Sequence, residues 1–379
     1  MILTSYITCD GLQNKLSFRT LSASSYPMLY FPFLRVKKGE INALCTLKPT
    51  SKYSVRPVLR IAPPDLDDRG NIVKPSFEYT TKIANTLQAV LAPASNLACF
   101  LDPGSSGISG DLLRSLLFSI TTSGGKFYPV YNLTGSEEYA QLYKALVGDD
   151  LPFILRIHIN ELNGTLLKRL GNAIDLYGVK LTKAFILLDA GDISAPATPL
   201  GLYETGLQGF IFRALNLNPA GIIISSTALP STITESAKWA QLQFPRKELD
   251  FFANVKTGVE GNMHFGDYAT GSVSIDPSPS RVGAPKARYT FAHYYEVIKG
   301  QKVGPSPYTM SEQFHRISMG IANHTDFPGK DFSWGDEFIY NASQPGAHPR
   351  GNATTWVAVN TSHHIEMVVS MLPAMTYAL

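Results

Sequence analysis

Polar residues that end several short apolar segments are the residues in this sequence best suited to chemistry. Asp102, Asp189 and Asp267 each follow or end such a segment, and Arg156 and His158 lie two positions apart within another. Carboxylate oxygens bind divalent cations such as Mg²⁺ or Mn²⁺, histidine serves as a general acid or base, and arginine holds phosphate or carboxylate groups. If these side chains converge, they form a site for metal-assisted hydrolysis of a phosphate ester, in a nucleotide or a nucleic acid.

The segment PFILRIHIN, residues 152–160, indicates how such side chains would converge. Side chains alternate between the two faces of a strand, so Arg156 and His158 share one face with Ile154 and Asn160. The opposite face is apolar and suits packing under helices. In a parallel barrel we expect the less apolar face to line the interior, where the carboxyl ends of the strands carry the catalytic residues.

The same alternation along the other segments gives each strand-end residue a predicted role. The predicted catalytic residues are Asp102, His158, Asp189 and Asp267. The predicted substrate-binding residues are Arg60, Asn132, Arg156, Ser225 and Tyr268. Four more polar residues complete the predicted ring, namely Arg35, Lys37, Asp192 and Ser226. In this hypothesis the carboxylates hold a cation, His158 transfers a proton and the arginines hold the phosphate.

The same residues also have a purely structural interpretation. An aspartate at a strand end often caps the next helix, and arginine–aspartate pairs inside a barrel neutralise a charged interior. Carboxylates within reach of one cation, beside unpaired arginine and histidine side chains, would favour an enzyme. Carboxylates that are each locked to an arginine or a helix N-terminus would favour a binding or scaffold protein.

Known catalytic signatures are absent from the sequence. It contains no P-loop, GxSxG, HExxH, EF-hand or CxxC motif. The stretch DPGSSGISG, residues 102–110, has the glycines and serines of a phosphate-binding loop but lacks the Gly-Lys pair of a Walker motif, so it is interpreted as a flexible loop. Cys9, Cys45 and Cys99 are too few and too widely spaced to predict a disulfide framework or a zinc site.

The elements that must position these residues follow a regular pattern. Short apolar segments, each closed by a turn-forming residue, alternate with segments of helical spacing, which is typical of parallel βα units. The predicted strands are 30–36, 56–62, 97–102, 126–133, 152–159, 183–189, 220–226 and 263–269. The predicted helices are 39–47, 76–92, 109–122, 136–147, 164–177, 203–214 and 232–253, the last broken at Pro245. This pattern predicts a (β/α)8 TIM-barrel-like fold, with an open doubly wound sheet as the alternative.

The remainder of the chain departs from this pattern. We predict an N-terminal extension over 1–27, the barrel over 28–286 and an aromatic, histidine-rich segment over 287–379 that covers one mouth of the barrel. Within the last segment, residues 311–324 are predicted to be helical. Of the adjacent His363 and His364, one is expected to be buried and one exposed, since neighbours in an extended strand point to opposite faces. Trp356 is expected to anchor the core, with its indole N–H bound to a backbone carbonyl.

Composition is that of a folded protein without a strong electrostatic footprint. The chain has 379 residues, 44% of them hydrophobic and 17% charged, with a formal net charge of +3. No apolar run reaches the roughly 20 residues that span a bilayer, so we expect no membrane partner. The six N-glycosylation tripeptides follow no signal peptide, so they are interpreted as accidental, and the expected location is the cytoplasm.

The stretch MLYFPFLRVKKGEINAL, from Met28, contains a Tyr-x-Pro-x-Leu strand, a Lys-Gly-Glu turn and a helix. It resembles the opening of the phage beta protein family, which is found in tailed phages and in bacterial mobile or defence-associated loci. Further matches are RPVLRIAPPD, FGDY, RYTFAHYYEVIKG, FSWGDEFI and GNATTWVAVNTSHHI, so the resemblance spans nearly everything from Met28 onward. The stretch YYEVIKG lacks the Trp and Arg of the family pattern, which leaves open how close a member the chain is.

The resemblance implies a biological setting and supplies no activity. We therefore expect a cytoplasmic barrel protein that acts in phage–host conflict, with metal-assisted phosphate-ester hydrolysis as its chemistry. The alternative is a non-enzymatic binding or scaffold protein that partners another product of the same phage or defence locus. A phage structural or assembly protein is a third possibility.

Overall fold

The computed structural model defines the path of most of the chain. It describes residues 27–63, 76–92, 95–104, 108, 110–148, 150–196, 198–231, 233, 239–275, 284–302, 304, 306–346 and 348–377. The predicted N-terminal extension, residues 1–27, lies almost wholly outside these ranges. Part of the loop at 102–110 and part of the stretch at 232–240 lie outside them too.

Eight parallel strands close into a barrel, in which each strand pairs with the next and the last pairs with the first. The strands are β1 (Tyr30–Arg35), β2 (Val58–Arg60), β3 (Phe100–Asp102), β4 (Tyr128–Asn132), β5 (Phe153–His158), β6 (Ala184–Asp192), β7 (Gly221–Thr227) and β9 (Met263–Asp267). Every predicted barrel strand is present. Closure confirms the TIM-barrel prediction, and the open doubly wound sheet does not form.

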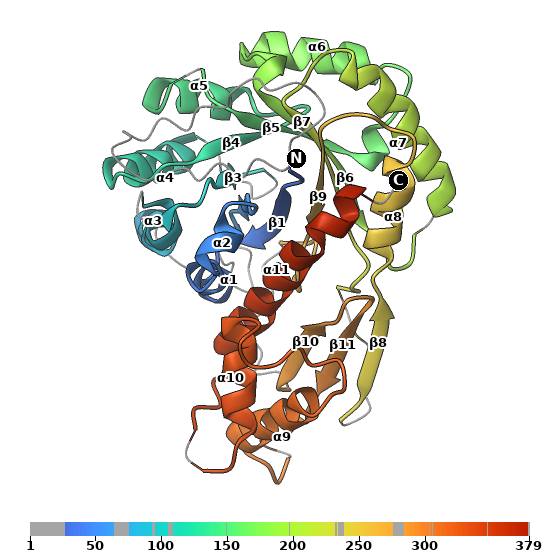
Figure 1. Ribbon diagram of the computed structural model, residues 1–379. Helices are drawn as coiled ribbons and strands as arrows, with labels where there is room; N and C mark the ends of the chain where they lie inside the picture. The colour runs from blue at the N-terminus through green and yellow to red at the C-terminus, as the bar shows by residue number, and fades with distance from the viewer. Residues whose placement is uncertain are drawn as a thin grey trace, which may run out of the picture.

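Helices surround this barrel in the order that the sequence predicts (Figure 1). They are α1 (Lys38–Cys45), α2 (Pro49–Lys52), α3 (Ser76–Leu91), α4 (Gly110–Thr122), α5 (Glu137–Leu146), α6 (Leu166–Tyr177), α7 (Leu200–Leu215) and α8 (Lys247–Lys256). Their apolar faces pack on the outward-facing strand residues and form the largest hydrophobic cluster.

The two faces of the barrel strands carry the predicted division of side chains. In β5, Leu155 and Ile157 belong to the large outer cluster, whereas Ile154 belongs to a separate cluster inside the barrel. The inner cluster also contains Phe33 and Tyr268. Arg156 and His158 therefore continue the inner face of β5 toward its carboxyl end, as predicted.

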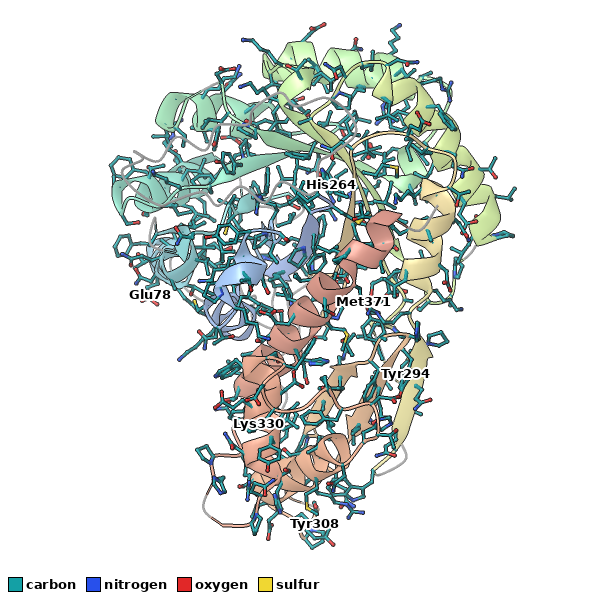
Figure 2. All side chains as sticks on the ribbon, in the orientation of Figure 1. Glu78, His264, Tyr294, Tyr308, Lys330 and Met371 are labelled. Carbon is teal, nitrogen blue, oxygen red and sulfur yellow. The ribbon has the colours of Figure 1, made fainter. Side chains whose placement is uncertain are left out.

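The barrel interior, near the amino ends of the strands, holds a buried histidine that the sequence did not single out. His264 lies among the barrel strands (Figure 2), where its ring contacts the rings of Phe31 and Phe185. Its Nδ1 accepts a hydrogen bond from the Leu29 amide at 3.2 Å. Burial, with a smaller contribution from Arg56, lowers the pKa of His264 to about 3, so the ring is neutral and acts as part of the packing.

A smaller antiparallel sheet lies below the barrel in Figure 1 and forms, with two helices, what we name the C-terminal subdomain. Its sheet has the order β10-β11-β8, made of β8 (Gln241–Pro245), β10 (Lys286–Thr290) and β11 (Tyr294–Lys299). Its helices are α9 (Met310–Ala322) and α10 (Trp334–Ser343). The helix predicted over 311–324 is confirmed, and the predicted domain boundary at 286 stays a prediction.

The predicted helix over 232–253 is wrong in its middle. Residues 241–245 form strand β8, and α8 begins only at Lys247. The sequence QLQFP alternates polar and apolar residues with the period of a strand, and its proline ends an edge strand, where the missing N–H is tolerated. Pairing with β11 therefore decides the local structure.

The long helix α11 (Ala353–Tyr377) joins the subdomain to the barrel (Figure 1). It packs against α1 on the barrel side and against α10 and β10 on the subdomain side. The extended conformation assumed for His363 and His364 is wrong, since both lie on this helix and both are buried. The Trp356 prediction is confirmed, because its Nε1 donates to the Arg350 carbonyl at 2.9 Å and the side chain is buried. Among the described residues, no helix has the length and apolar character that crossing a bilayer requires.

A glycine sets the crossing of α10 and α11. A Cβ on Gly335 would overlap the Val359 carbonyl oxygen of α11. We expect Gly335→Ala to lower the free energy of unfolding by about 1–3 kcal/mol, because the two helices would have to separate. Denaturant unfolding followed by circular dichroism measures this. Gly320→Ala in α9 is the control: its Cβ would meet only ordinary contacts, so its stability should stay equal or rise slightly.

Candidate functional site

Inward-facing residues at the carboxyl ends of the barrel strands form one polar layer above the apolar interior. We name it the mouth layer. It consists of Arg60, Asp102, Asn132, Arg156, Asp189, Ser225 and Tyr268. The charged members are all buried. The sequence predicted every one of these residues, and the structure brings them together because each continues the inner face of its strand.

Arg156 is the centre of this layer. Its Nη1 donates to Asp102 Oδ2 at 2.7 Å, and its Nη2 donates to Asp189 Oδ2 at 2.6 Å. Its Nε also donates to Asp189 Oδ2, at 3.0 Å. One guanidinium therefore bridges the carboxylates of β3 and β6, which matches the structural interpretation of these aspartates.

Tyr268 completes the environment of Asp189. Its hydroxyl lies 2.8 and 2.7 Å from Asp189 Oδ1 and Oδ2. Burial of Asp189 opposes its ionisation, but the charge of Arg156, then that of His158, and hydrogen bonds from Tyr268 and Arg156 outweigh this and hold its pKa below the usual value. Asp189 is therefore a carboxylate at neutral pH.

His158 lies at the edge of the mouth layer, at the end of β5. Its Nδ1 is 3.6 Å from Asp189 Oδ2, and 47% of its side chain is exposed. It lines a cavity of about 290 Å³ with Gly104, Asn132, Thr134, Arg156, Asn160 and Glu161. The His158 backbone is fixed by a hydrogen bond from its amide to Glu161 Oε2 at 2.9 Å. Gly104, Thr134, Asn160 and Glu161 were not predicted as site residues. Their positions just after predicted strands were the feature of the sequence that could have identified them as site residues.

Three buried polar atoms of the mouth layer have no hydrogen-bond partner among the described residues. They are Arg60 Nε, Asp102 Oδ1 and Ser225 Oγ. The rest of the Arg60 guanidinium donates to the carbonyls of Ser272 and Val273 at 2.7 and 2.5 Å. Buried polar atoms without partners are costly, and they concentrate at sites that bind ligands or ordered water.

Asp267 does not join this layer, contrary to the prediction. It points out of the barrel, where it accepts hydrogen bonds from Tyr30 at 2.5 Å and from the Ala269 amide at 2.9 Å, and its Oδ2 lies 2.9 Å from His364 Nε2. The physical reason is strand alternation: the inner face of β9 continues through Tyr268, so its neighbour faces outward.

The predicted cation site is therefore not assembled from the three carboxylates. Asp102 and Asp189 share Arg156, while Asp267 is turned away. Asp192 accepts the Ser194 amide at 2.9 Å and caps its own turn. In the part of the chain that the structure describes, no three histidine, cysteine, aspartate or glutamate side chains gather as metal ligands would.

The adjacent histidines of α11 take part in two separate buried pairs. His363 Nδ1 lies 2.8 Å from Asp336 Oδ2, and His363 Nε2 lies 2.6 Å from the Thr290 carbonyl. His364 pairs with Asp267 on the barrel side. Neighbours on a helix point about 100° apart, so the two rings reach the subdomain and the barrel respectively. The prediction of one buried and one exposed histidine is wrong because the helix is enclosed on both sides.

The fold and the mouth layer together define the class of this protein. A closed, eight-stranded parallel barrel with polar side chains at the carboxyl ends of its strands is a (β/α)8 or TIM barrel. The family model described as Beta protein matches residues 30–370. The chain belongs to the Beta protein family.

Comparisons with other known proteins give more distant likenesses. No curated protein matches the chain. Dihydropteroate synthase from Anaplasma phagocytophilum is similar with a TM-score of 0.38 and 10% identity, over 66% of this chain and 95% of that one. A family 18 chitinase from Crocus vernus has a TM-score of 0.29 and 13% identity, over 50% and 70% of the two chains. The spore cortex-lytic enzyme SleL from Bacillus megaterium also has a TM-score of 0.29, with 12% identity over 77% and 67%.

Proposed function

We propose that the chain binds a small polar molecule at the carboxyl-terminal mouth of the barrel and transfers a proton to or from it through His158. The observation that carries this proposal is the position of His158, which is half exposed in a cavity and lies 3.6 Å from the buried carboxylate of Asp189. A carboxylate beside Nδ1 favours the tautomer with its proton on that nitrogen. Nε2 is then free to accept a proton from a bound molecule.

The lining of the cavity indicates the kind of molecule. Asn132, Thr134 and Asn160 offer neutral hydrogen-bonding groups, and Arg156 is already paired with two carboxylates. Such a surface suits a ligand with hydroxyl, carbonyl or amide groups. The unpartnered Asp102 Oδ1 and Ser225 Oγ in the same layer add to the support for ligand binding.

Metal-assisted hydrolysis of a phosphate ester has less support from this geometry. The scheme requires Asp102, Asp189 and Asp267 around one cation, and Asp267 faces the other side of its strand. Hydrolysis in which His158 deprotonates an attacking water molecule needs no such set of carboxylates. Of the two hydrolytic schemes, the proposal therefore includes this one, in which His158 acts as the general base.

The second candidate function is a non-enzymatic platform for another protein of the same phage or defence locus. The observation that favours it is the pairing of Asp102 and Asp189 with one arginine, since each carboxylate is then already held by a protein counter-charge and needs no ligand for this purpose. Under this candidate, the protein acts in phage–host conflict through binding alone. Turnover of a bound small molecule distinguishes the two candidates.

The test begins with a thermal-shift screen of small polar molecules on the full chain, since a ligand of the folded state raises its apparent stability. For a molecule that binds, we expect Asn132→Ala to weaken binding. We expect His158→Gln to lower kcat by about 10²–10⁴-fold with a small change in affinity. His293→Gln, at an exposed histidine of the subdomain, is the matched control and should change neither. Equal turnover by His158→Gln and the wild type would contradict the proton-transfer role.

A further inference from the structure

Basic side chains gather where the C-terminal subdomain meets the barrel. In the ladder between β10 and β11, Lys286 lies directly opposite Lys299. Arg288 follows two residues later on β10, so it shares the face of Lys286. The sheet therefore places Lys286, Lys299 and Arg288 on one face.

The barrel adds further arginines at the same junction. Arg288 Nη1 donates to the Thr270 carbonyl at 3.0 Å, while Arg60 donates to the Ser272 and Val273 carbonyls. The segment after β9 thus lies between an arginine of the subdomain and one of the barrel. Arg35 is the register partner of Arg60 on the neighbouring strand, which brings a further guanidinium to this end of the barrel.

The positive charges at this junction act on one another. Burial, followed by the charges of Arg288, Lys299 and Arg35, lowers the pKa of Lys286 to about 8. Burial and the charge of Arg35 lower the pKa of Arg288 to about 10. Among the described residues, neither Lys286 nor Arg288 forms an ion pair, and Arg35 pairs with Glu40 at 2.8 Å. Positive charge at this place therefore exceeds the negative charge that balances it.

We propose that Arg35, Lys286 and Arg288 form a binding site for the phosphate group of a small molecule. A phosphate offers several acceptor oxygens and a double negative charge, which match the Lys286 ammonium and the N–H groups that remain on the two guanidinium groups. Arg35 Nε and Nη2 already meet Glu40 Oε1, and Arg288 Nη1 and Nη2 each already donate to a backbone carbonyl. Pairing within the sheet fixes the backbone of Lys286 and Arg288, and β1 fixes that of Arg35. The His158 cavity is built from other elements, the ends of β4 and β5 and the turns that follow β3, β4 and β5, so this site stands independently of the proposed proton transfer.

Inorganic phosphate is the probe that tests this site. Its binding to the full chain is measured by thermal shift and by calorimetry, at constant ionic strength maintained with chloride. We expect phosphate to stabilise the wild type, and the double variant Lys286→Gln/Arg288→Gln to bind it roughly tenfold to a hundredfold more weakly. The double variant Lys168→Gln/Arg213→Gln removes the same charges from α6 and α7 and should bind as the wild type does.

Equal binding by both double variants, or no binding by the wild type, would overturn the proposal. Because Arg288 also holds the Thr270 carbonyl, circular dichroism checks the fold of its variant. Lys286→Gln alone, which removes no side-chain hydrogen bond among the described residues, provides a second measurement and should still weaken binding severalfold. Binding of a short single-stranded DNA is measured as well, to distinguish a small phosphorylated molecule from the backbone of a nucleic acid as the source of the phosphate. Salt-sensitive binding of DNA without any binding of inorganic phosphate would contradict a small-molecule site.

Discussion

Replacement of Arg156 with methionine should lower the free energy of unfolding by about 3–5 kcal/mol. The guanidinium is buried and is the shared partner of Asp102 and Asp189. Methionine approximates the length of the side chain but leaves two carboxylates buried near each other without a counter-charge. Removal of one partner from a buried ion pair is much more damaging than replacement of the whole group, because the remaining charge is uncompensated.

Urea unfolding at neutral pH measures this loss. Arg169→Met is the matched control, since Arg169 pairs with Glu161 at 2.9 Å near the surface and should cost less than about 1 kcal/mol. Adding Asp102→Asn and Asp189→Asn to Arg156→Met should recover part of the stability, because the buried negative charges are removed with the positive one. A loss for Arg156→Met no larger than that of Arg169→Met would show that water reaches the mouth layer and solvates the carboxylates.

Asp336→Ala should destabilise the protein by about 3–5 kcal/mol as well. The Asp336 carboxylate accepts hydrogen bonds from the Tyr289 hydroxyl at 2.5 Å and from Ser333 Oγ at 2.6 Å, and it lies 2.8 Å from His363 Nδ1. These partners belong to β10, to the start of α10 and to α11, so one carboxylate joins three elements of the structure. Alanine would leave a tyrosine hydroxyl and an imidazole buried without their acceptor.

The same unfolding assay, applied to Asp336→Ala and to Asp331→Ala, tests this expectation. Asp331 is exposed and, among the described residues, pairs with its neighbour Lys330 alone, so its removal should leave the unfolding midpoint unchanged. The loss at Asp336 should appear in near-ultraviolet circular dichroism too, because Tyr289 stacks on His363 with ring centroids 3.9 Å apart. An unchanged midpoint for Asp336→Ala would mean that α11 is held by its apolar contacts alone.

The barrel could be predicted because each of its strands carries its own local signal. A run such as AFILLD or GIIIS is apolar on both faces and ends in a polar residue, which is typical of a parallel strand covered by helices. The alternation within β5 even assigned Arg156 and His158 to the correct face. Strand β8 carries only a short signal, the alternation of five residues, and it becomes a strand through pairing with β11, far along the chain.

The residues of the candidate site were predictable, but the ion pairs that they form were not. The pattern of each strand placed Asp102, Arg156 and Asp189 at the mouth of the barrel. Which carboxylate meets which cation depends on how the barrel closes, and the sequence does not encode this locally. The same holds for α11: its valines and threonines suit a strand, and packing against α1 and β10 makes it a helix.

The position of β8 in the chain has a consequence for biosynthesis. A ribosome makes β8 before α8 and β9, and its hydrogen-bonding partner β11 follows only after the barrel strands are complete. The partner of Asp267 is made even later, because His364 lies 97 residues further along the chain. During this interval the nascent chain exposes an unpaired strand and a carboxylate without its histidine. Unpaired strand edges promote aggregation, so we expect the subdomain sheet and its junction with the barrel to be fully protected only when synthesis has reached α11.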